Sequence, residues 1–199
     1  MKRDIVQYGD PVLRARGHRV SRVDQRIRDL AVDMLETMHA AKGVGLAAQQ
    51  VGEALQLTVI DVSEIEDRPS TLRINGVETD VAEAMPLILL NPEVTLGSEI
   101  ATGLEGCLSF PEITADIDRA ESVVVRAETL DGAKIQIEAT GLLARALQHE
   151  VDHLNGILFI DRMSSALKVS LASRLKRLQK ETQQGQGRTR LSRAGQSAL

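Results

Sequence analysis

The segment Gln148–His153 constrains this chain most, because it reads Gln-His-Glu-Val-Asp-His and places two histidines four residues apart. On a helix, residues four apart lie one above the other, so His149 and His153 can reach a single metal ion. Glu150 lies beside that ion, where a carboxylate can accept and return a proton. A bound divalent ion also lowers the pKa of its water towards neutrality. The motif therefore predicts a helix and favours metal-assisted hydrolysis.

Size and composition are those of a globular chain that can bury a core without disulfides. The 199 residues are most simply one domain, with 43% hydrophobic and 26% charged residues. Aromatic residues make up only 2%, which argues against a surface that stacks nucleic-acid bases. No apolar run reaches about 18 residues and no signal peptide is visible, so we expect no membrane segment and a cytoplasmic protein. The single cysteine, Cys107, excludes an internal disulfide and fits a reducing compartment.

Charge is distributed unevenly along the chain. Residues 168–199 contain eight lysines or arginines and one acid, whereas the rest carries 16 basic and 27 acidic residues. The last stretch is also rich in Gln, Gly and Ser. We therefore predict a catalytic domain over residues 1–181 and a basic, disordered tail over residues 182–199.

The first half of the chain shows one helix pattern and two strand patterns. Apolar residues recur at three- and four-residue steps over residues 24–43, which predicts an amphipathic helix. Residues 55–62 and 86–92 are short apolar runs and predict strands. Between them, residues 63–85 contain six acids and the turn signal Asn75-Gly76, which predicts an exposed excursion.

The second half adds a hairpin and two helices. Alternating residues on both sides of Asp131-Gly132 predict an antiparallel hairpin over residues 123–138. Thr140 is expected to cap the motif helix and Gly156 to end it. A leucine-lined helix is expected over residues 167–180. These elements predict an α+β fold, with antiparallel sheets around a central motif-bearing helix and with N-terminal and C-terminal helices.

The metal needs a third protein ligand, because catalytic sites of this type generally use three and leave one position open. Cys107 is chemically attractive, since a thiolate is soft and is deprotonated at a metal. A lone cysteine can equally be a small buried hydrophobe, so spacing alone leaves the choice open. The other candidates, each with a weaker case, are Asp161, Glu181, His18 and His39.

Three segments of the chain, taken together, resemble the signature segments of the peptide deformylase family. They are Gly43–Gln50, Glu105–Ser109 and His149–Gly156, in this order. The resemblance extends from about residue 6 to residue 177. It implies a metal-dependent hydrolase that removes the formyl group from the initiator methionine of nascent polypeptides and releases formate.

The resemblance also implies roles for individual residues. It assigns the metal to Cys107, His149 and His153, and the catalytic acid and base to Glu150. In the same way, the side-chain amide of Gln50 and the backbone N–H of Leu108 are expected to stabilise charge on the reacting carbonyl oxygen. Losing one such donor typically raises the barrier by about 3 kcal/mol.

Substrate contacts are expected along a cleft. By the resemblance, Val44 and Gly45 line it and pair with the peptide backbone as a strand does, and Glu105 contacts the substrate. Leu142 and Ala146 share a helical stripe with the histidines and are positioned to shape a methionine pocket, although core packing explains them equally well. A phosphate-binding loop at the glycines is disfavoured, because no Lys-Ser or Lys-Thr follows.

The cofactor and partners follow in part from the resemblance. It implies one divalent ion, ferrous iron in the cell, with zinc, nickel or cobalt able to occupy the site. The partners are formyl-methionyl nascent peptides, and the basic C-terminal helix raises the hypothesis of contact with ribosomal RNA. The chain departs from the family in having Gln49 where proline is frequent, and in the length of residues 63–85.

Two other classes of protein remain as alternatives. A general metallopeptidase that cleaves internal peptide bonds would share the motif helix but require a different third ligand and a wider cleft. A non-catalytic metal- or peptide-binding protein would keep the motif as scaffold. The presence of both Glu150 and Gln50 argues against the second class, because a structural metal site needs neither residue.

Overall fold

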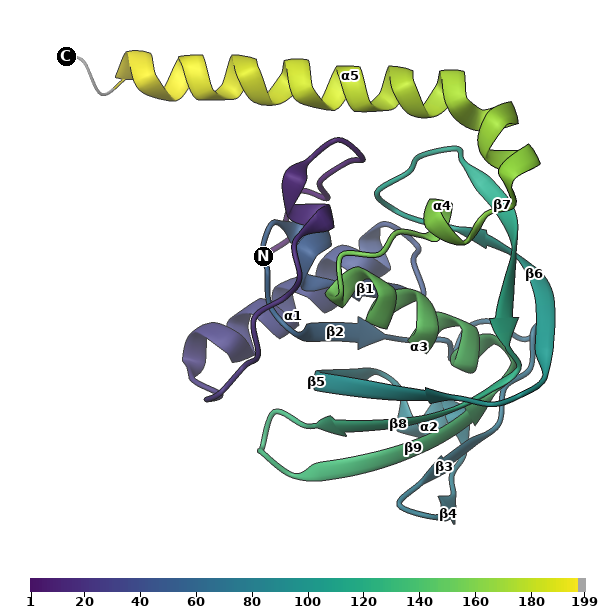
Figure 1. The fold of residues 1–199 in the computed structure, drawn as a ribbon. Coiled ribbons are helices and arrows are strands. Elements are labelled where there is room, and N and C mark those ends of the chain that lie inside the picture. The colour runs from purple at the N-terminus through teal and green to yellow at the C-terminus, as the bar shows by residue number, and fades with distance from the viewer. Residues whose placement is uncertain (197–199) are drawn as a thin grey trace.

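The structure is a computed structural model, and it describes residues 1–196 (Figure 1). Five α-helices are present in this range: α1 (Gln25–Ala40), α2 (Val81–Ala84), α3 (Gly141–Leu154), α4 (Phe159–Arg162) and α5 (Ser165–Gln196). Two short 3₁₀ helices cover Pro11–Arg14 and Ala48–Val51. The strands are β1 (Gly45–Ala47), β2 (Leu57–Ile60), β3 (Leu72–Ile74), β4 (Val77–Glu78), β5 (Leu87–Leu96), β6 (Ile100–Gly106), β7 (Thr114–Ala120), β8 (Ser122–Glu128) and β9 (Lys134–Thr140).

The strands form two antiparallel sheets, which confirms the predicted α+β class. The larger sheet has the strand order β1-β2-β5-β8-β9-β3-β4, and β6 pairs with β7 alone. The predicted hairpin is β8–β9, in which Glu128 pairs with Lys134 across the Asp131-Gly132 turn. Gly132 has φ +85°, a conformation that favours glycine. Strands of both sheets contact helix α3, which therefore lies between the two sheets.

Helix α3 is the central helix that the sequence predicted. Every residue from Leu142 to Leu154 is buried, and the helix lies at the middle of the molecule (Figure 1). Its side chains Leu142, Leu143 and Leu147 belong to the same apolar cluster as Val125 and Ile137 of the β8–β9 hairpin. Burial all round the helix is what carries the polar motif residues into the interior.

The two ends of α3 are held differently from each other. Thr140 occupies the predicted N-cap position, but its side chain makes no capping hydrogen bond. Instead, the hydroxyl of Ser70 accepts a hydrogen bond of 2.9 Å from the N–H of Leu143. At the other end, Gly156 has φ +73°, as expected of a glycine that ends a helix.

Helix α1 matches its prediction closely. The side chain of Asp24 accepts a hydrogen bond from the N–H of Ile27 and caps the helix. The apolar face of α1, including Leu30 and Met34, packs with β1 and β2 in a second apolar cluster. Helix α1 thereby backs β1, the strand that starts at the glycine-rich segment.

The acidic stretch 63–85 is partly folded. It contains β3, β4 and α2, with the Asn75-Gly76 turn between the two strands as predicted. Strand β3 pairs with β9, where Leu72 lies opposite Ala139. The stretch is therefore an exposed extension of the main sheet.

The last helix runs along one side of the molecule and continues to Gln196 (Figure 1). Its first half packs four leucines (167, 171, 175 and 178) on a third apolar cluster, which contains Phe110 and Phe159. Composition predicts disorder for residues 182–199, but in the structure residues 182–196 continue this helix. Residues 197–199 lie outside the described part. The division into a domain and a tail stays a prediction. Within residues 1–196, no helix is both long and apolar enough to cross a membrane.

Candidate metal centre and active site

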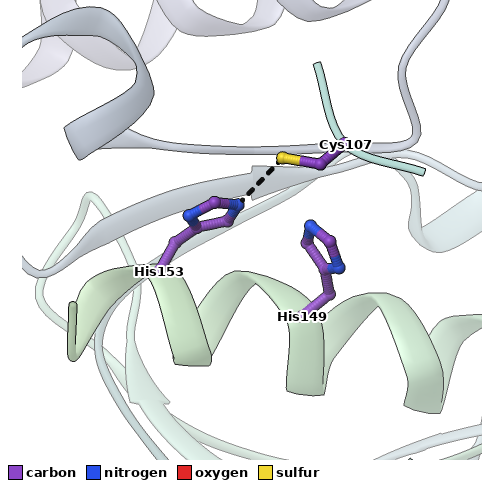
Figure 2. A group of neighbouring side chains, drawn as sticks. All are labelled: Cys107, His149 and His153. Atoms are coloured by element: carbon purple, nitrogen blue, oxygen red, sulfur yellow. Dashed lines mark hydrogen bonds between the residues drawn. The ribbon is translucent and has the colours of Figure 1, made fainter. Parts of the chain in front are cut away.

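Three side chains from two distant segments meet at one point (Figure 2). Cys107 directly follows β6, and His149 and His153 lie one turn apart on α3, turned towards the thiol. The Cys107 sulfur is 3.3 Å from Nε2 of His153, and ligand atoms of all three residues lie within 4.8 Å of one another. Two of the weaker candidates have other partners: His39 pairs with Asp61, and Asp161 with Arg14.

The charge distribution at this point suits a cation. Nδ1 of His149 is hydrogen-bonded to a carboxylate oxygen of Glu105 at 2.9 Å, so its other ring nitrogen faces Cys107. Burial lowers the pKa of His149, but the hydrogen bonds with Cys107 and Glu105 outweigh it and raise that pKa well above its ordinary value. Burial and the neighbouring His149 together lower the pKa of His153. The sulfur and nitrogen donors of the three residues fit a zinc- or iron-type ion.

Glu105 is the centre of a buried ion-pair network. Its carboxylate accepts hydrogen bonds from Arg119 at 2.9 and 3.1 Å and from Arg145 at 2.8 Å, besides that of His149. Burial raises the pKa of Glu105, but His149 and Arg119 outweigh it and lower the pKa to about 2. Arg119 also pairs with Asp152. The network fixes the ring of His149, as carboxylates behind metal-binding histidines commonly do.

Arg145 ties the β6–β7 sheet to α3. Its guanidinium donates to the backbone oxygens of Ala101 at 2.7 Å and Ile117 at 2.8 Å. A Cβ atom on Gly103 would lie 3.0 Å from the guanidinium carbon, so glycine leaves the space that this group occupies. No sequence motif predicts a role for Arg119 or Arg145. The one signal in the sequence is Arg145 itself, a charged residue among the apolar residues in the first turns of the motif helix.

Glu150 is held at the inner end of the pocket. The residue is buried, and Oε2 has no hydrogen-bond partner among the described residues. Burial, together with the charge of Glu105, raises the pKa of Glu150 to about 7, against the opposing effect of His149. Gly45 faces this carboxylate so closely that a Cβ there would lie 2.8 Å from Cδ of Glu150. Glu150 therefore has the environment of a general acid and base, which works best with a pKa near the operating pH.

Gln50 and Leu108 lie on the other side of the cysteine. The side-chain oxygen of Gln50 accepts a hydrogen bond from Ala47 N–H at 2.9 Å, which turns its amide nitrogen towards Ser109 Oγ (3.3 Å) and Cys107 Sγ (3.5 Å). The Leu108 N–H donates no hydrogen bond to another described residue. Two N–H donors thus lie next to the thiol, and that of Leu108 has no acceptor among the described residues.

A cavity of about 470 Å³ opens onto these groups. The predicted substrate residues all line it, namely Val44, Gly45, Glu105, Leu142 and Ala146. Both carboxylate oxygens of Glu105 are already engaged by the arginines and His149. Residues of β1, β6 and α3 together form the walls of the cavity.

Comparison with known proteins agrees with this geometry. The family model described as polypeptide deformylase matches residues 2–169. The chain belongs to the polypeptide deformylase family. A peptide deformylase from Opitutus terrae is 43% identical over 180 residues, covering 89% of this chain and 93% of the relative. The chain is accordingly an enzyme of a metal-dependent hydrolase family.

Solved structures of the family share the fold. Peptide deformylase 1B from Arabidopsis thaliana, in complex with an inhibitor, has a TM-score of 0.79 at 34% identity and covers 94% of both chains. A Synechococcus elongatus peptide deformylase in complex with actinonin has a TM-score of 0.73 at 41% identity and covers 86% of both. The family fold thus extends over most of the described chain.

Two further residues of this deformylase-family chain have clear structural roles. Gln49 is fully buried, and its amide nitrogen donates to the backbone oxygen of Leu154 at 3.3 Å, which ties the glycine-rich segment to the end of α3. Asp152, which follows the motif glutamate by two positions, pairs with Arg119 and Arg162 and not with an imidazole.

Proposed function

We propose that this chain hydrolyses the formamide bond of N-formylmethionyl peptides and releases formate. The observation that supports it most is the buried carboxylate of Glu150, with one oxygen free, beside the Cys107–His149–His153 group at the end of a peptide-sized cavity. Membership of the deformylase family supports the same activity. Hydrolysis adds the hydroxyl of water to the formyl carbon, breaks the C–N bond and returns the proton to the amine.

Cys107, His149 and His153 would hold the metal ion. The proposed ion in the cell is Fe²⁺, with Zn²⁺, Ni²⁺ or Co²⁺ able to take its place, since sulfur and imidazole donors suit all four. When bound, such an ion acts as a Lewis acid and makes water more acidic. Metal analysis of protein purified without oxygen, together with loss of activity in air, tests the assignment of iron.

Glu150 is assigned both proton transfers. Its free oxygen accepts the proton of the attacking water, and the same carboxyl group returns that proton to the departing amine. The amide nitrogen of Gln50 and the N–H of Leu108 donate to the carbonyl oxygen as negative charge develops on it. Gln50 is oriented for this by its bond with Ala47, so it is in place before substrate binds.

The methionine and the peptide backbone take the rest of the cavity. The edges of β1 and β6, at Val44, Gly45 and Glu105, flank the substrate, which would pair with them as an added strand. Leu142 and Ala146 form the apolar surface for the methionine side chain. In this assignment Glu105 acts through His149 as a positioning residue, because its own oxygens are occupied.

The assay that tests the function measures formate released from a formyl-Met peptide and from intact, unformylated protein. Release from the peptide alone supports the proposal over a general metallopeptidase. Cleavage of internal peptide bonds without formate release would contradict it. No formate from metal-loaded protein would favour a non-catalytic binding protein.

We further propose a cytoplasmic location and contact with ribosomal RNA through α5. The helix exposes Lys176, Arg177 and Lys180 on the side away from its partly buried leucines. Binding that depends on such cations weakens as salt rises. Ribosome co-sedimentation at several salt concentrations, with the wild type, a 182–199 deletion and the Lys176→Gln/Arg177→Gln variant, tests the contact. Equal binding by all three proteins would contradict it.

A further inference from the structure

The loop that precedes β3 is packed against the first turn of α3. Ser70 accepts the hydrogen bond of the Leu143 N–H at 2.9 Å. Gly141 has φ +65°, and a Cβ atom there would lie 3.3 Å from the Cα atom of Ser70. Ile65, earlier in the loop, packs against the main apolar cluster. The loop is therefore fixed to the helix that carries the metal ligands.

This loop carries one residue to the catalytic cavity. Arg68 lines the cavity, whereas the acidic residues Glu66 and Asp67 next to it do not. Arg68 is exposed and forms no ion pair with any described residue. Lys42, which follows α1, is a second exposed cation that lines the same cavity without an ion pair in the described chain. Two unpaired positive charges thus stand at the mouth of the site.

The length of α3 shows which part of a substrate these cations would meet. Leu142, Ala146 and His149 line the cavity in that order, and a rise of 1.5 Å per residue places the first turn about 10 Å from His149. An extended peptide advances about 3.3 Å per residue. With the methionine side chain lying over Ala146 and Leu142, the backbone of a peptide whose formyl group is beside His149 therefore comes level with the first turn of α3 at about its second or third residue.

We propose that Arg68, supported by Lys42, binds an acidic side chain at the second or third residue of the formylated peptide. This specificity rests on the proposed deformylase function and extends it to a preferred class of substrate. Three carboxylates line the same cavity and could compete for Arg68. Glu105 is paired with Arg119 and Arg145, and Glu150 lies at the end where the formyl group would react. Glu112 is exposed on the loop that follows Cys107. The acidic residues of the excursion do not line the cavity, and none of them forms an ion pair with Arg68 in the described chain.

The test compares substrates that differ in a single side chain. Formyl-Met-Glu-Ala, formyl-Met-Gln-Ala and formyl-Met-Lys-Ala, with the same series shifted to the third residue, are used as C-terminal amides so that no terminal carboxylate competes. We expect the metal-loaded wild type to favour Glu over Gln by about three- to fivefold in kcat/KM at one of the two positions, and Lys to be the poorest. The preference should shrink as salt rises.

Two variants assign the preference to Arg68. In Arg68→Gln the Glu-to-Gln ratio of kcat/KM should fall towards one. Arg73→Gln, which removes an exposed arginine of the same excursion that does not line the cavity, should keep the wild-type ratio. Equal rates for Glu and Gln at both positions in the wild type, or an undiminished ratio in Arg68→Gln, would overturn the inference.

The same assay separates this inference from the function on which it rests. If no peptide of the series releases formate, the proposed function fails and the inference fails with it. If all peptides release formate at equal rates, the function stands and only the role of Arg68 is rejected. Because Arg68 is exposed, the variant is expected to fold normally, which a thermal melt checks.

Discussion

Glu150 combines three properties that a surface carboxylate lacks. It is buried, one of its oxygens has no partner in the described chain, and its pKa is raised to about 7. Gly45 permits this arrangement, since any side chain at that position would occupy the space of the carboxylate. A carboxylate oxygen that no protein group engages is free to exchange a proton with substrate.

Replacing Glu150 with Gln should abolish the proton transfer and leave the fold intact. Gln has nearly the same shape but does not accept a proton, so formate release should fall by about 10²- to 10⁴-fold. Steady-state formate release at equal metal content measures the effect. Gln also removes a buried ionisable group, so the thermal midpoint should not fall. Undiminished turnover would reject Glu150 as acid and base.

Glu105 makes a prediction about stability and pH. Its pKa is lowered to about 2 in the folded protein from an ordinary value of 4.5, so it stabilises the fold above pH 4.5 and loses that contribution as the pH falls towards 2. Glu105→Gln leaves Arg145 without an ionic partner and Arg119 with Asp152 alone, so it should lower the unfolding free energy by about 3 kcal/mol at pH 7. Urea unfolding of both proteins between pH 7 and pH 2 measures the difference.

The control for this experiment is Glu99→Gln, which changes an exposed carboxylate next to β6. It should alter stability by less than about 0.5 kcal/mol at every pH. A Glu105 effect that stayed constant down to pH 2 would contradict the prediction, because the wild-type carboxylate would then contribute nothing through its charge.

At the residue scale, sequence reasoning found the groups that define a motif and missed those that support them. His149, Glu150 and His153 are recognisable because their spacing is set by the helix itself. Arg119 and Arg145 meet Glu105 only after β6, β7 and α3 have packed together. No local pattern records such a meeting, since the partners are separated by many residues and each taken alone resembles an ordinary surface charge.

At the scale of elements, the start of α3 depends on a residue from another segment. The Ser70 hydroxyl accepts the Leu143 N–H, whereas Thr140, at the cap position, bonds instead with Thr71 at 2.7 Å. The bond between Ser70 and Leu143 therefore joins the loop that precedes β3 to the helix that carries the proposed metal ligands.

Ser70→Ala should lower the stability of the protein more than Thr140→Ala does. Loss of a capping hydroxyl costs about 1 kcal/mol, which corresponds to a fall of about 2–4 °C in the thermal midpoint for a chain of this size. Differential scanning calorimetry of the two variants and the wild type measures the shifts. A larger loss from Thr140→Ala would show that the local cap, and not Ser70, holds the start of the helix.

Elements with a regular apolar period were predicted correctly, and those without one were not. Helix α1 and the β8–β9 hairpin show their periods in the sequence. The β6–β7 pair does not, because the buried positions of β7 are occupied by Ala115, Ile117 and the ion-paired Arg119. A charged residue at a buried strand position hides the alternation that would otherwise reveal the strand.

At the scale of the whole molecule, the proposed metal site lies where two structural units meet. Cys107 belongs to the unit built around β6–β7, Phe110 and Phe159, and the two histidines belong to α3, which packs on the main sheet. An ion bound to all three residues connects these units across the cavity. Because such a site is complete only in the folded chain, binding should stabilise the folded state by mass action.

Removing the metal should therefore lower the thermal midpoint as well as the activity. At a free metal concentration about a thousand times Kd, the stabilisation is about 4 kcal/mol, so chelation should lower the midpoint by about 8–16 °C. Adding back Fe²⁺ without oxygen, or Ni²⁺, should restore both quantities. The matched control is Cys107→Ala, whose midpoint should barely respond to chelator or metal, because two imidazoles alone bind the ion weakly. If that variant responded as strongly as the wild type, the cysteine would not be a ligand, and the ion would connect no part of the β6–β7 unit to α3.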